Sequence, residues 1–347
     1  MKVLVTGNQG YIGCVMEEML LERGYEVIGL DAEFFKGKNF IPIKENVIKN
    51  RKNNQIIRDI REITGKDLEG CDAVIHLAAL SNDPLGDLNP KLTEDINFKA
   101  TVKLAEAAKE AGCKRFLYSS SCSLYGASDI TKPVDETASF NPQTPYAESK
   151  VNCESALQKL ADKNFSPSYM RNATAYGVSP RMRFDIVLNN LCGWAFTTGE
   201  VVMISDGKPW RPIVHIRDIC AAFIAVLESP KEKIHNQAFN VGITEENFTI
   251  REIAEKVVKG IPNTTLKCLN KNSCDNRSYR VSFEKIKTLE NFKPEWDTEK
   301  GIQELYKTFQ LIELTKEIFE DEYFTTLKRI KSLKERKEIT EELKWQN

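Results

Sequence analysis

A glycine-rich turn near the amino terminus is the feature that most narrows the folds open to this chain. Gly7, Gly10 and Gly13 lie at intervals of three residues, after an apolar run at 3–5 and before an amphipathic stretch at 14–21. This order predicts a buried β-strand, a tight turn and a helix. The glycines alone could form an ordinary βα turn, but with the flanking strand and helix they predict the beginning of a dinucleotide-binding βαβ unit.

The parts of this unit have physical roles in binding a dinucleotide. The glycines allow a tight turn, an approach of the backbone to a pyrophosphate, and close packing of helix on strand. The amino end of the helix offers unpaired N–H groups and a partial positive charge. A second apolar run at 26–30 ends at Asp31, whose carboxylate can bind both ribose hydroxyls and repel a 2′-phosphate. The sequence therefore predicts NAD rather than NADP as the cofactor.

Length and composition indicate a globular protein with a sizeable core. The chain has 347 residues, which suits a large domain with a smaller one appended. Its net charge of −1 gives no basis for binding nucleic acid or an anionic membrane, and no apolar run is long enough to span a bilayer. Nine cysteines without a CxxC pair indicate a reducing, cytoplasmic setting. The close pair Cys268 and Cys274 lacks further ligands, so no metal site is expected.

Two later apolar runs end in small or polar residues. The run at 71–79 ends in Leu77-Ala78-Ala79, whose small side chains let a cofactor lie against the backbone. The run at 114–121 ends in Ser119-Ser120-Ser121. Because ligands bind at the carboxyl edge of such sheets, both ends are expected at the site. His76, inside the first run, is predicted to be a core residue.

Two polar residues near this edge leave alternatives open. Asp59, in a short strand predicted at 55–60, can accept a hydrogen bond from an adenine amino group or cap the next segment of the chain, and the two roles can coexist. Asn97, inside a helix predicted over 90–112, can face the cofactor or the solvent. The polar stretch at 32–55 is predicted to be an irregular surface loop.

Tyr146 and Lys150 are the main candidates for catalysis. They lie four residues apart in a helix predicted to begin at 144, so they share one face. A lysine ammonium beside a phenol lowers the pKa of the phenol, so Tyr146 can act as a general base on a sugar hydroxyl. Ser121 can hold the same oxygen. Tyr-x-x-x-Lys alone also occurs on solvated helix faces, but its combination with the glycine turn and the serine-rich strand end is much less common.

These motifs resemble the extended short-chain dehydrogenase/reductase family, and within it the NAD-dependent nucleotide-sugar epimerase/dehydratase branch. The resemblance continues through Arg171, the segment 211–218, the segment 239–242 and Arg277, and covers about residues 1–305. It implies an α/β fold with a Rossmann-type doubly wound parallel sheet, a smaller C-terminal α/β substrate-binding lobe and a helical C-terminal tail.

The resemblance also implies domain bounds. The NAD-binding domain is expected over 1–178, with segments at about 212–242 returning to it. The substrate-binding lobe is expected over 179–305 and the helical tail over 306–347. A homodimer is implied as well, formed through helices that include the one carrying Tyr146.

Roles of single residues follow from the resemblance. Ser121, Tyr146 and Lys150 are the expected catalytic residues. The residues expected to bind NAD are Gly7, Gly10, Tyr11, Ile12, Gly13, Asp31, Asp59, Ile60, Leu77, Ala78, Ala79, Asn97, Ser119 and Lys150. The residues expected to contact the substrate, a nucleotide-diphosphate sugar, are Ser81, Cys122, Ser123, Thr174, Arg183, Arg211 and Arg277. Arginine forks match phosphate oxygens, which makes the last two suitable for the diphosphate.

The expected reaction is epimerisation of the sugar, at C4, through a transient ketone. Ser121-Cys122-Ser123 stands where the 4,6-dehydratases of the family carry Thr-Asp-Glu, which disfavours dehydration. Cys122 is interpreted as a proton donor or as a buried, inert thiol. Thr174 stands where many epimerases carry asparagine. The segment 179–185 resembles a subgroup that includes sugar-nucleotide 4-dehydrogenases acting on heptoses.

Two alternatives therefore accompany the epimerase. The first is a sugar-nucleotide 4-dehydrogenase or 4-ketoreductase of the same family. The second, from a different class, is a non-catalytic module that senses NAD, because dinucleotide folds also serve such functions. The intact set of serine, tyrosine and lysine argues against the sensor.

Overall fold

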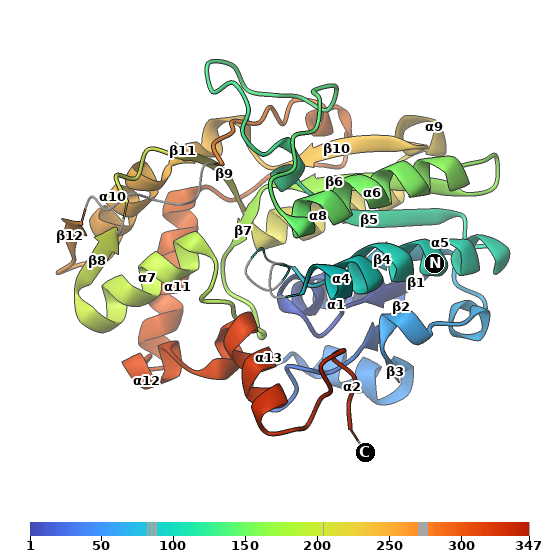
Figure 1. The fold of residues 1–347 in the computed structure, drawn as a ribbon, viewed down its shortest axis with the longest axis horizontal. Helices are drawn as coiled ribbons and strands as arrows, with labels where there is room; N and C mark the ends of the chain where they lie inside the picture. The colour runs from blue at the N-terminus through green and yellow to red at the C-terminus, as the bar shows by residue number, and fades with distance from the viewer. Residues whose placement is uncertain (82, 84–85, 87–88, 204, 270–276, 347) are drawn as a thin grey trace.

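The central sheet of the computed structural model has seven strands, and the structure describes residues 1–346 except 82, 84–85, 87–88, 204 and 270–276. The strands are β1 (Lys2–Thr6), β2 (Glu26–Asp31), β3 (Gln55–Ile57), β4 (Ala73–His76), β5 (Arg115–Ser121), β6 (Ser166–Asn172) and β10 (Gln237–Val241). All neighbours are parallel, in the order β10-β6-β5-β4-β1-β2-β3 (Figure 1). The strand order reverses between β1 and β4, which is the ligand-binding switch point of a Rossmann-type sheet.

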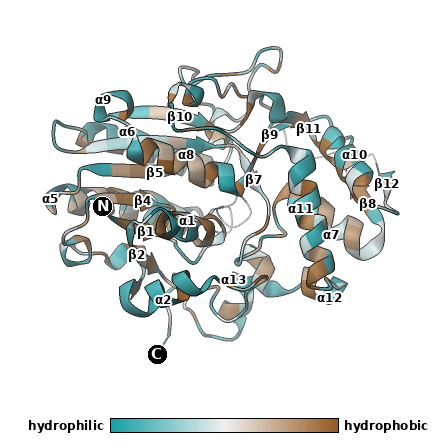
Figure 2. Ribbon diagram, turned by 180° about the vertical axis from the view of Figure 1, so that it is seen from behind, coloured by the Kyte–Doolittle hydropathy of each residue, from teal (hydrophilic) through white to brown (hydrophobic). Residues whose placement is uncertain are grey.

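Helices cover both faces of this sheet. On one face lie α1 (Tyr11–Glu22) and α8 (Ile216–Glu228), and on the other lie α5 (Ala100–Glu110) and α6 (Pro145–Leu160). The buried apolar residues accordingly form two clusters, and Figure 2 shows hydrophobic residues along the central strands and α8. Strands buried on both faces explain why the sequence shows continuous apolar runs rather than alternation.

The carboxyl-terminal half builds a smaller lobe, which Figure 1 shows at the carboxyl ends of the large sheet. It holds a three-stranded sheet, β11-β9-β7, and a parallel pair, β12-β8. The strands are β7 (Thr174–Tyr176), β8 (Glu200–Met203), β9 (Trp210–His215), β11 (Asn247–Thr249) and β12 (Thr265–Cys268). The helices of this lobe are α7 (Val187–Thr198), α10 (Ile250–Gly260) and α11 (Thr298–Leu311). The short α9 (Lys231–Ile234) lies beside β10 of the large sheet.

Several predictions made from local pattern are confirmed. The glycine turn joins β1 to α1 and β2, and the predicted tyrosine helix is α6. His76 is a core residue: its ring nitrogens lie 2.6 Å from Thr6 Oγ1 and 2.7 Å from Thr101 Oγ1. Burial lowers the pKa of His76 to about 3, so the ring is neutral. It therefore takes no part in acid–base chemistry at neutral pH.

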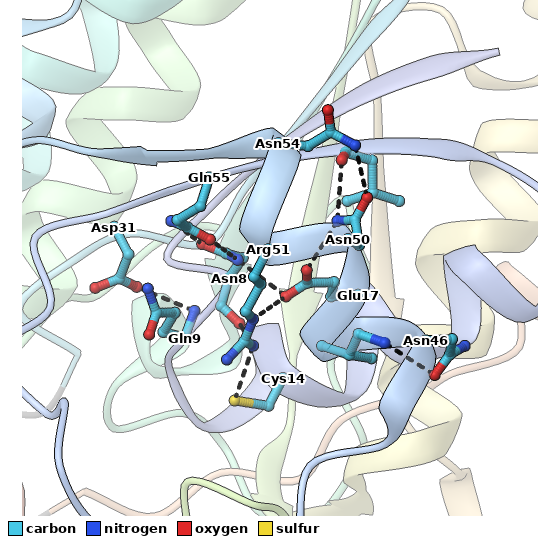
Figure 3. Close-up of polar contacts among 12 residues, drawn as sticks. Asn8, Gln9, Cys14, Glu17, Asp31, Asn46, Asn50, Arg51, Asn54 and Gln55 are labelled. Atoms are coloured by element: carbon cyan, nitrogen blue, oxygen red, sulfur yellow. Dashed lines mark hydrogen bonds and ion pairs between the residues drawn. The ribbon is translucent and has the colours of Figure 1, made fainter.

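The prediction of an irregular loop between β2 and β3 is wrong, because α2 (Glu45–Asn54) lies there. Val47 is its one buried residue, so no apolar periodicity marks the helix. Polar contacts hold it instead. Arg51 Nε lies 2.8 Å from Glu17 Oε2, and Asn50 Nδ2 donates to Glu17 Oε1 at 3.1 Å (Figure 3). A fully buried carboxylate on α1 thus anchors a helix that has almost no apolar face.

The single helix predicted over 90–112 is divided by a π-helical turn. It consists of α4 (Pro90–Thr93), the π-helical turn η3 (Glu94–Lys99) and α5. Asn97 lies in that turn and is 1% exposed. Its side chain accepts a hydrogen bond from the N–H of Leu80 at 2.7 Å and donates to the Leu80 carbonyl at 3.1 Å. The turn therefore fixes the backbone just after β4.

A buried ion pair joins α6 to the strands beneath it. Arg171 Nη2 on β6 lies 2.7 Å from Glu154 Oε2 on α6, and both side chains are 6% exposed. Ser120 on β5 donates to the same carboxylate at 2.5 Å. Arg171 also donates to the Tyr125 hydroxyl at 3.0 Å. These contacts fix α6, the helix of Tyr146, relative to β5 and β6.

Replacing Arg171 with methionine would leave the Glu154 carboxylate buried without its cation. We expect the free energy of unfolding to fall by about 3–5 kcal/mol, the usual cost of breaking a buried pair from one side. Urea denaturation followed by circular dichroism measures the loss. The control is Lys99→Met, which removes an exposed pair with Asp95 and should leave stability almost unchanged. Equal stability of the two variants would contradict the prediction.

Candidate active site

A cavity of about 770 Å³ runs along the carboxyl edge of the sheet and into the smaller lobe. Residues from both halves of the chain form its wall. The predicted site residues in that wall are Gly7, Gly10, Tyr11, Ile12, Gly13, Asp31, Asp59, Ile60, Leu77, Ala78, Ala79, Ser81, Ser119, Ser121, Ser123, Tyr146, Lys150, Thr174, Arg183, Arg211 and Arg277. The fold thus brings most of the predicted set to one place.

The glycine turn leaves backbone exposed to the cavity where side chains would not fit. Gly7 has a φ of +70°, and a Cβ there would lie 2.9 Å from the Ala78 nitrogen. A Cβ at Gly13 would lie 2.0 Å from the Gly7 carbonyl oxygen. The first N–H groups of α1 have no partners within the helix and are available to an anion. This end of the cavity therefore suits a diphosphate.

Asp31 lines the same end, at the end of β2. Its carboxylate accepts a hydrogen bond from the Gln9 N–H at 3.1 Å, as Figure 3 shows, and one from the Glu33 N–H at 2.7 Å. Burial raises the pKa of Asp31, and these two bonds oppose that rise. Because each carboxylate oxygen has a second lone pair, Asp31 can still accept from ribose hydroxyls.

Asp59 also lies in the wall and has the capping role considered from the sequence. Its Oδ1 accepts a hydrogen bond from the Arg61 N–H at 2.8 Å, which caps the short 3₁₀ helix η1 (Ile60–Glu62). The Arg61 guanidinium also pairs with this carboxylate at 2.5 Å. The contact of Asp59 with an adenine stays a prediction.

Arg181 lines the cavity and was not among the predicted site residues. It is 3% exposed, its guanidinium lies 3.8 Å from the centre of the Phe35 ring, and its Nη1 donates to the Met182 carbonyl at 2.5 Å. Its Nε has no hydrogen-bond partner among the described residues. Burial lowers the pKa of Arg181 to about 9. A buried cation with a spare donor in the wall fits a bound anion, such as the diphosphate of a dinucleotide.

Ser121, Tyr146 and Lys150 meet where β5 ends and α6 begins. The Ser121 Oγ accepts a hydrogen bond from the Ser123 N–H at 3.1 Å. Lys150 Nζ donates to the Ser119 carbonyl at 2.7 Å and lies 5.4 Å from the centre of the Tyr146 ring. Thr144 caps α6 and so sets where the helix begins. All three residues line the cavity.

The pKa of the Tyr146 phenol is raised overall, and the lowering expected from the Lys150 charge stays a prediction. Burial raises the pKa of the Tyr146 phenol and the charge of Asp83 raises it further, while the hydrogen bond with Ser121 lowers it. Burial also lowers the pKa of Lys150 to about 8. Burial is the largest cause of the upward shift at Tyr146, and spacing along a helix does not reveal burial.

Three predicted arginines lie toward the smaller lobe. Arg183 Nε pairs with Asp185 Oδ1 at 2.8 Å. Arg211 Nη1 donates to the Arg277 carbonyl at 2.5 Å, and the Arg277 guanidinium pairs with Asp83. Two of these three cations are thus paired with carboxylates, and the binding of a diphosphate by Arg211 and Arg277 stays a prediction.

Two predicted contacts lie behind the wall instead of in it. Cys122 is 1% exposed and its Sγ donates to a carbonyl of β6 at 3.1 Å. Burial raises the pKa of this thiol well above its usual value, which favours the inert interpretation over the proton donor. The Asn97 side chain is hydrogen-bonded to the N–H and the carbonyl of Leu80. Residues 82, 84 and 85, which follow the predicted substrate contact Ser81, lie outside the described residues.

Neither a group of metal-ligating side chains nor a membrane-spanning helix is found among the residues that the structure describes. In that part, no group of three or more His, Cys, Asp and Glu could hold a metal ion. No helix among the same residues is long and apolar enough to cross a membrane. The eight described cysteines are free, and all except Cys268 are buried. Cys274 lies outside the described residues.

Comparison with known proteins identifies related chains. The NAD-dependent epimerase/dehydratase family matches residues 3–242. UDP-glucuronic acid decarboxylase 1 of Arabidopsis thaliana is 27% identical over 89% of this chain and 70% of its own length, and UDP-glucose 4-epimerase of Bacillus subtilis is 27% identical over 75% and 82%. The structure of UDP-glucuronic acid 4-epimerase from Bacillus cereus with UDP-glucuronic acid and NAD superposes with a TM-score of 0.73. It is 25% identical and covers 90% of this chain and all of that one.

Removal of the Asp31 carboxylate tests its role in selecting the cofactor. We expect Asp31→Ala to weaken NADH binding about tenfold or more, the usual effect of losing hydrogen bonds to a charged group, and to narrow the gap between NADH and NADPH. Fluorescence titration with each cofactor measures both affinities. Asp72→Ala, at an exposed position before β4, is the control. Unchanged affinities for both cofactors would refute this role.

Arg181 gives a prediction in which stability and binding change in opposite directions. Arg181→Met removes a buried charge that lacks a carboxylate partner at hydrogen-bond distance among the described residues. We therefore expect the free protein to be as stable as wild type or more so. We also expect NADH affinity to fall by about tenfold, because a charged contact to phosphate is lost. Thermal unfolding and NADH titration are the two measurements. Full NADH affinity would contradict the assignment.

Proposed function

The chain belongs to the NAD-dependent epimerase/dehydratase family, and from this premise we propose that it epimerises a nucleotide-diphosphate sugar at C4 through a transient ketone. The observation that carries the proposal is the single cavity wall. It joins the glycine turn, the group formed by Ser121, Tyr146 and Lys150, and the arginines of the smaller lobe. Such a wall holds a dinucleotide and a sugar nucleotide end to end, with an acid–base group between them. The relatives named as 4-epimerases support this choice of reaction.

When bound, NAD supplies the acceptor that takes a hydride from the sugar carbon and later returns it. Tyr146 removes the proton of the sugar hydroxyl, and Ser121 donates a hydrogen bond to the same oxygen. Arg211 and Arg277 hold the diphosphate, which keeps the sugar within reach of the phenol. The glycine turn, Asp31 and Arg181 would hold the cofactor. Tyr146 would give its proton back to the ketone oxygen when hydride returns to the opposite face of the sugar, which would invert the carbon.

The phenol of Tyr146 must lose its proton to act as a base. Because burial raises its pKa, positive charge close to the ring is needed to make the phenolate accessible. Lys150 carries that charge at neutral pH, because its own pKa lies at about 8. The bond from its Nζ to the Ser119 carbonyl holds the ammonium in place.

The alternatives differ in the fate of the ketone or in whether oxidation occurs at all. A 4-dehydrogenase or 4-ketoreductase uses the same residues but exchanges its ketone and cofactor with solution. A 4,6-dehydratase needs acid–base groups after Ser121, where this chain has a thiol behind the wall and the Ser123 hydroxyl. The non-catalytic sensor has no use for a serine, tyrosine and lysine that meet in the cavity.

The cellular localisation and the oligomeric state of the protein follow the same lines. We propose a cytoplasmic protein, which agrees with the eight described cysteines, all of them free and seven of them buried. We propose a homodimer formed through helices that include α6. Neither nucleic acid nor a membrane is expected as a partner, because the chain is close to neutral.

The reaction is tested by incubating the enzyme with UDP-, GDP- and dTDP-sugars and identifying products by NMR. We expect one sugar to be converted to its C4 epimer without accumulation of reduced cofactor. Accumulation of a ketone with reduced cofactor would favour the 4-dehydrogenase. An absence of change with every sugar would favour the sensor.

The base is tested by Tyr146→Phe, which removes the phenolic oxygen. We expect turnover to fall about 10²–10⁴-fold, the usual contribution of a general base. NADH affinity should stay within about twofold, because the ring remains. Tyr25→Phe is the matched control, since that hydroxyl bonds Glu228 at the surface. Turnover in Tyr146→Phe equal to that of the control would refute the mechanism.

A further inference from the structure

The carboxyl-terminal tail leaves the smaller lobe and returns to the amino-terminal half. After α11 come α12 (Lys316–Phe319), the 3₁₀ helix η7 (Glu322–Phe324) and α13 (Thr326–Glu335). A bridge between Ile339 and Trp345 comes next. Figure 1 shows α13 and the C-terminus beside α2 and β3, at the β2–β3 edge of the large sheet. The tail lies outside residues 3–242, where the family matches.

The tail is bonded to the loop after β2. Arg329 Nε donates to the Phe34 carbonyl at 2.9 Å, and Trp345 Nε1 donates to the Ala32 carbonyl at 2.6 Å. The rings of Phe34 and Trp345 lie 5.7 Å apart. The tail therefore holds the segment directly after Asp31 from its outer side.

A second attachment joins the tail to the segment after β3. Arg61 Nη2 donates to the Leu343 carbonyl at 3.3 Å, and Lys344 Nζ lies 3.2 Å from Glu62 Oε1. Leu343 is 2% exposed and belongs to the same apolar cluster as Ile60. The apolar contact contributes more than the exposed ion pair.

These two segments are the walls of one end of the cavity. Ala32 and Phe34 of the first segment and Asp59 and Ile60 of the second all line it. Four residues of the tail also line the cavity. They are Thr325, Thr326, Leu327 and Ile330.

Among these residues Ile330 is 1% exposed and belongs to the buried apolar cluster that contains Ile60. Thr326 is 5% exposed. The surface that the tail presents to the cavity is thus partly apolar, with two hydroxyls. A purine and its ribose have matching chemistry, because the base offers a flat apolar face and the sugar offers hydroxyls.

We propose that residues 325–345 are part of the dinucleotide site, where they close its adenosine end and retain NAD between turnovers. The proposal rests on the NAD site of the proposed function and on none of the sugar chemistry. Because both segments that flank the adenosine are bonded to the tail, the cofactor leaves only when those contacts open. Retention suits a reaction in which the same cofactor molecule takes the hydride and returns it.

The test measures how fast bound NADH leaves the full-length enzyme in the absence of sugar. NADH-loaded protein is mixed with excess NAD, and the loss of NADH fluorescence is followed in a stopped-flow instrument. We expect Leu327→Ala, which removes side chain from the cavity wall, to speed dissociation about tenfold. Lys331→Ala, on the exposed side of the same helix, should keep the wild-type rate.

A second pair of variants guards against a folding defect in the first. Trp345 is 43% exposed, so Trp345→Ala removes the bond to Ala32 without opening the core. It should also speed dissociation, whereas Gln346→Ala, at the adjacent exposed position, should not. Wild-type dissociation rates in both Leu327→Ala and Trp345→Ala would overturn the proposal. Because no sugar is present, this result is independent of whether the proposed epimerisation is correct.

Discussion

One buried carboxylate, that of Glu154, determines where α6, the helix of Tyr146, lies. It lies on α6 one turn beyond Lys150 and is bonded to Arg171 on β6 and Ser120 on β5. Helix and strands cannot slide past one another without leaving a charge unpaired in the core. The distance between the phenol of Tyr146 and the end of β5 is therefore set beneath the cavity.

The parts of the fold that depend on local pattern were predictable. The order of strand, glycine turn, helix and strand follows from apolar periodicity. Glycine is needed at positions 7 and 13, because a Cβ there would clash with Ala78 or with Gly7. Convergence of the site was predictable too, because the carboxyl ends of parallel strands share an edge. Strand ends that carry Asp31 and Ser121 must meet there, although ninety residues separate them.

Features that local pattern does not encode were missed. The helix α2 buries Val47 alone and depends on Glu17, so its periodicity is hidden among polar residues. The tail bonds to Ala32 from more than three hundred residues away. Arg181 differs from its neighbour Arg183 only in what surrounds it, since one stacks on Phe35 and the other pairs with a carboxylate. The pKa of Tyr146 likewise depends on burial, which no spacing shows.

The π-helical turn η3 has a consequence for how this region can vary. A π turn holds one more residue than a regular turn, so the side chains before and after it are out of phase by about 100°. Deleting one residue between 94 and 99 would restore a regular helix and rotate Asn97 away from the backbone of Leu80. Related chains that lack this extra residue would need a different way to hold the segment after β4. Helix length here is therefore coupled to the shape of the cavity floor.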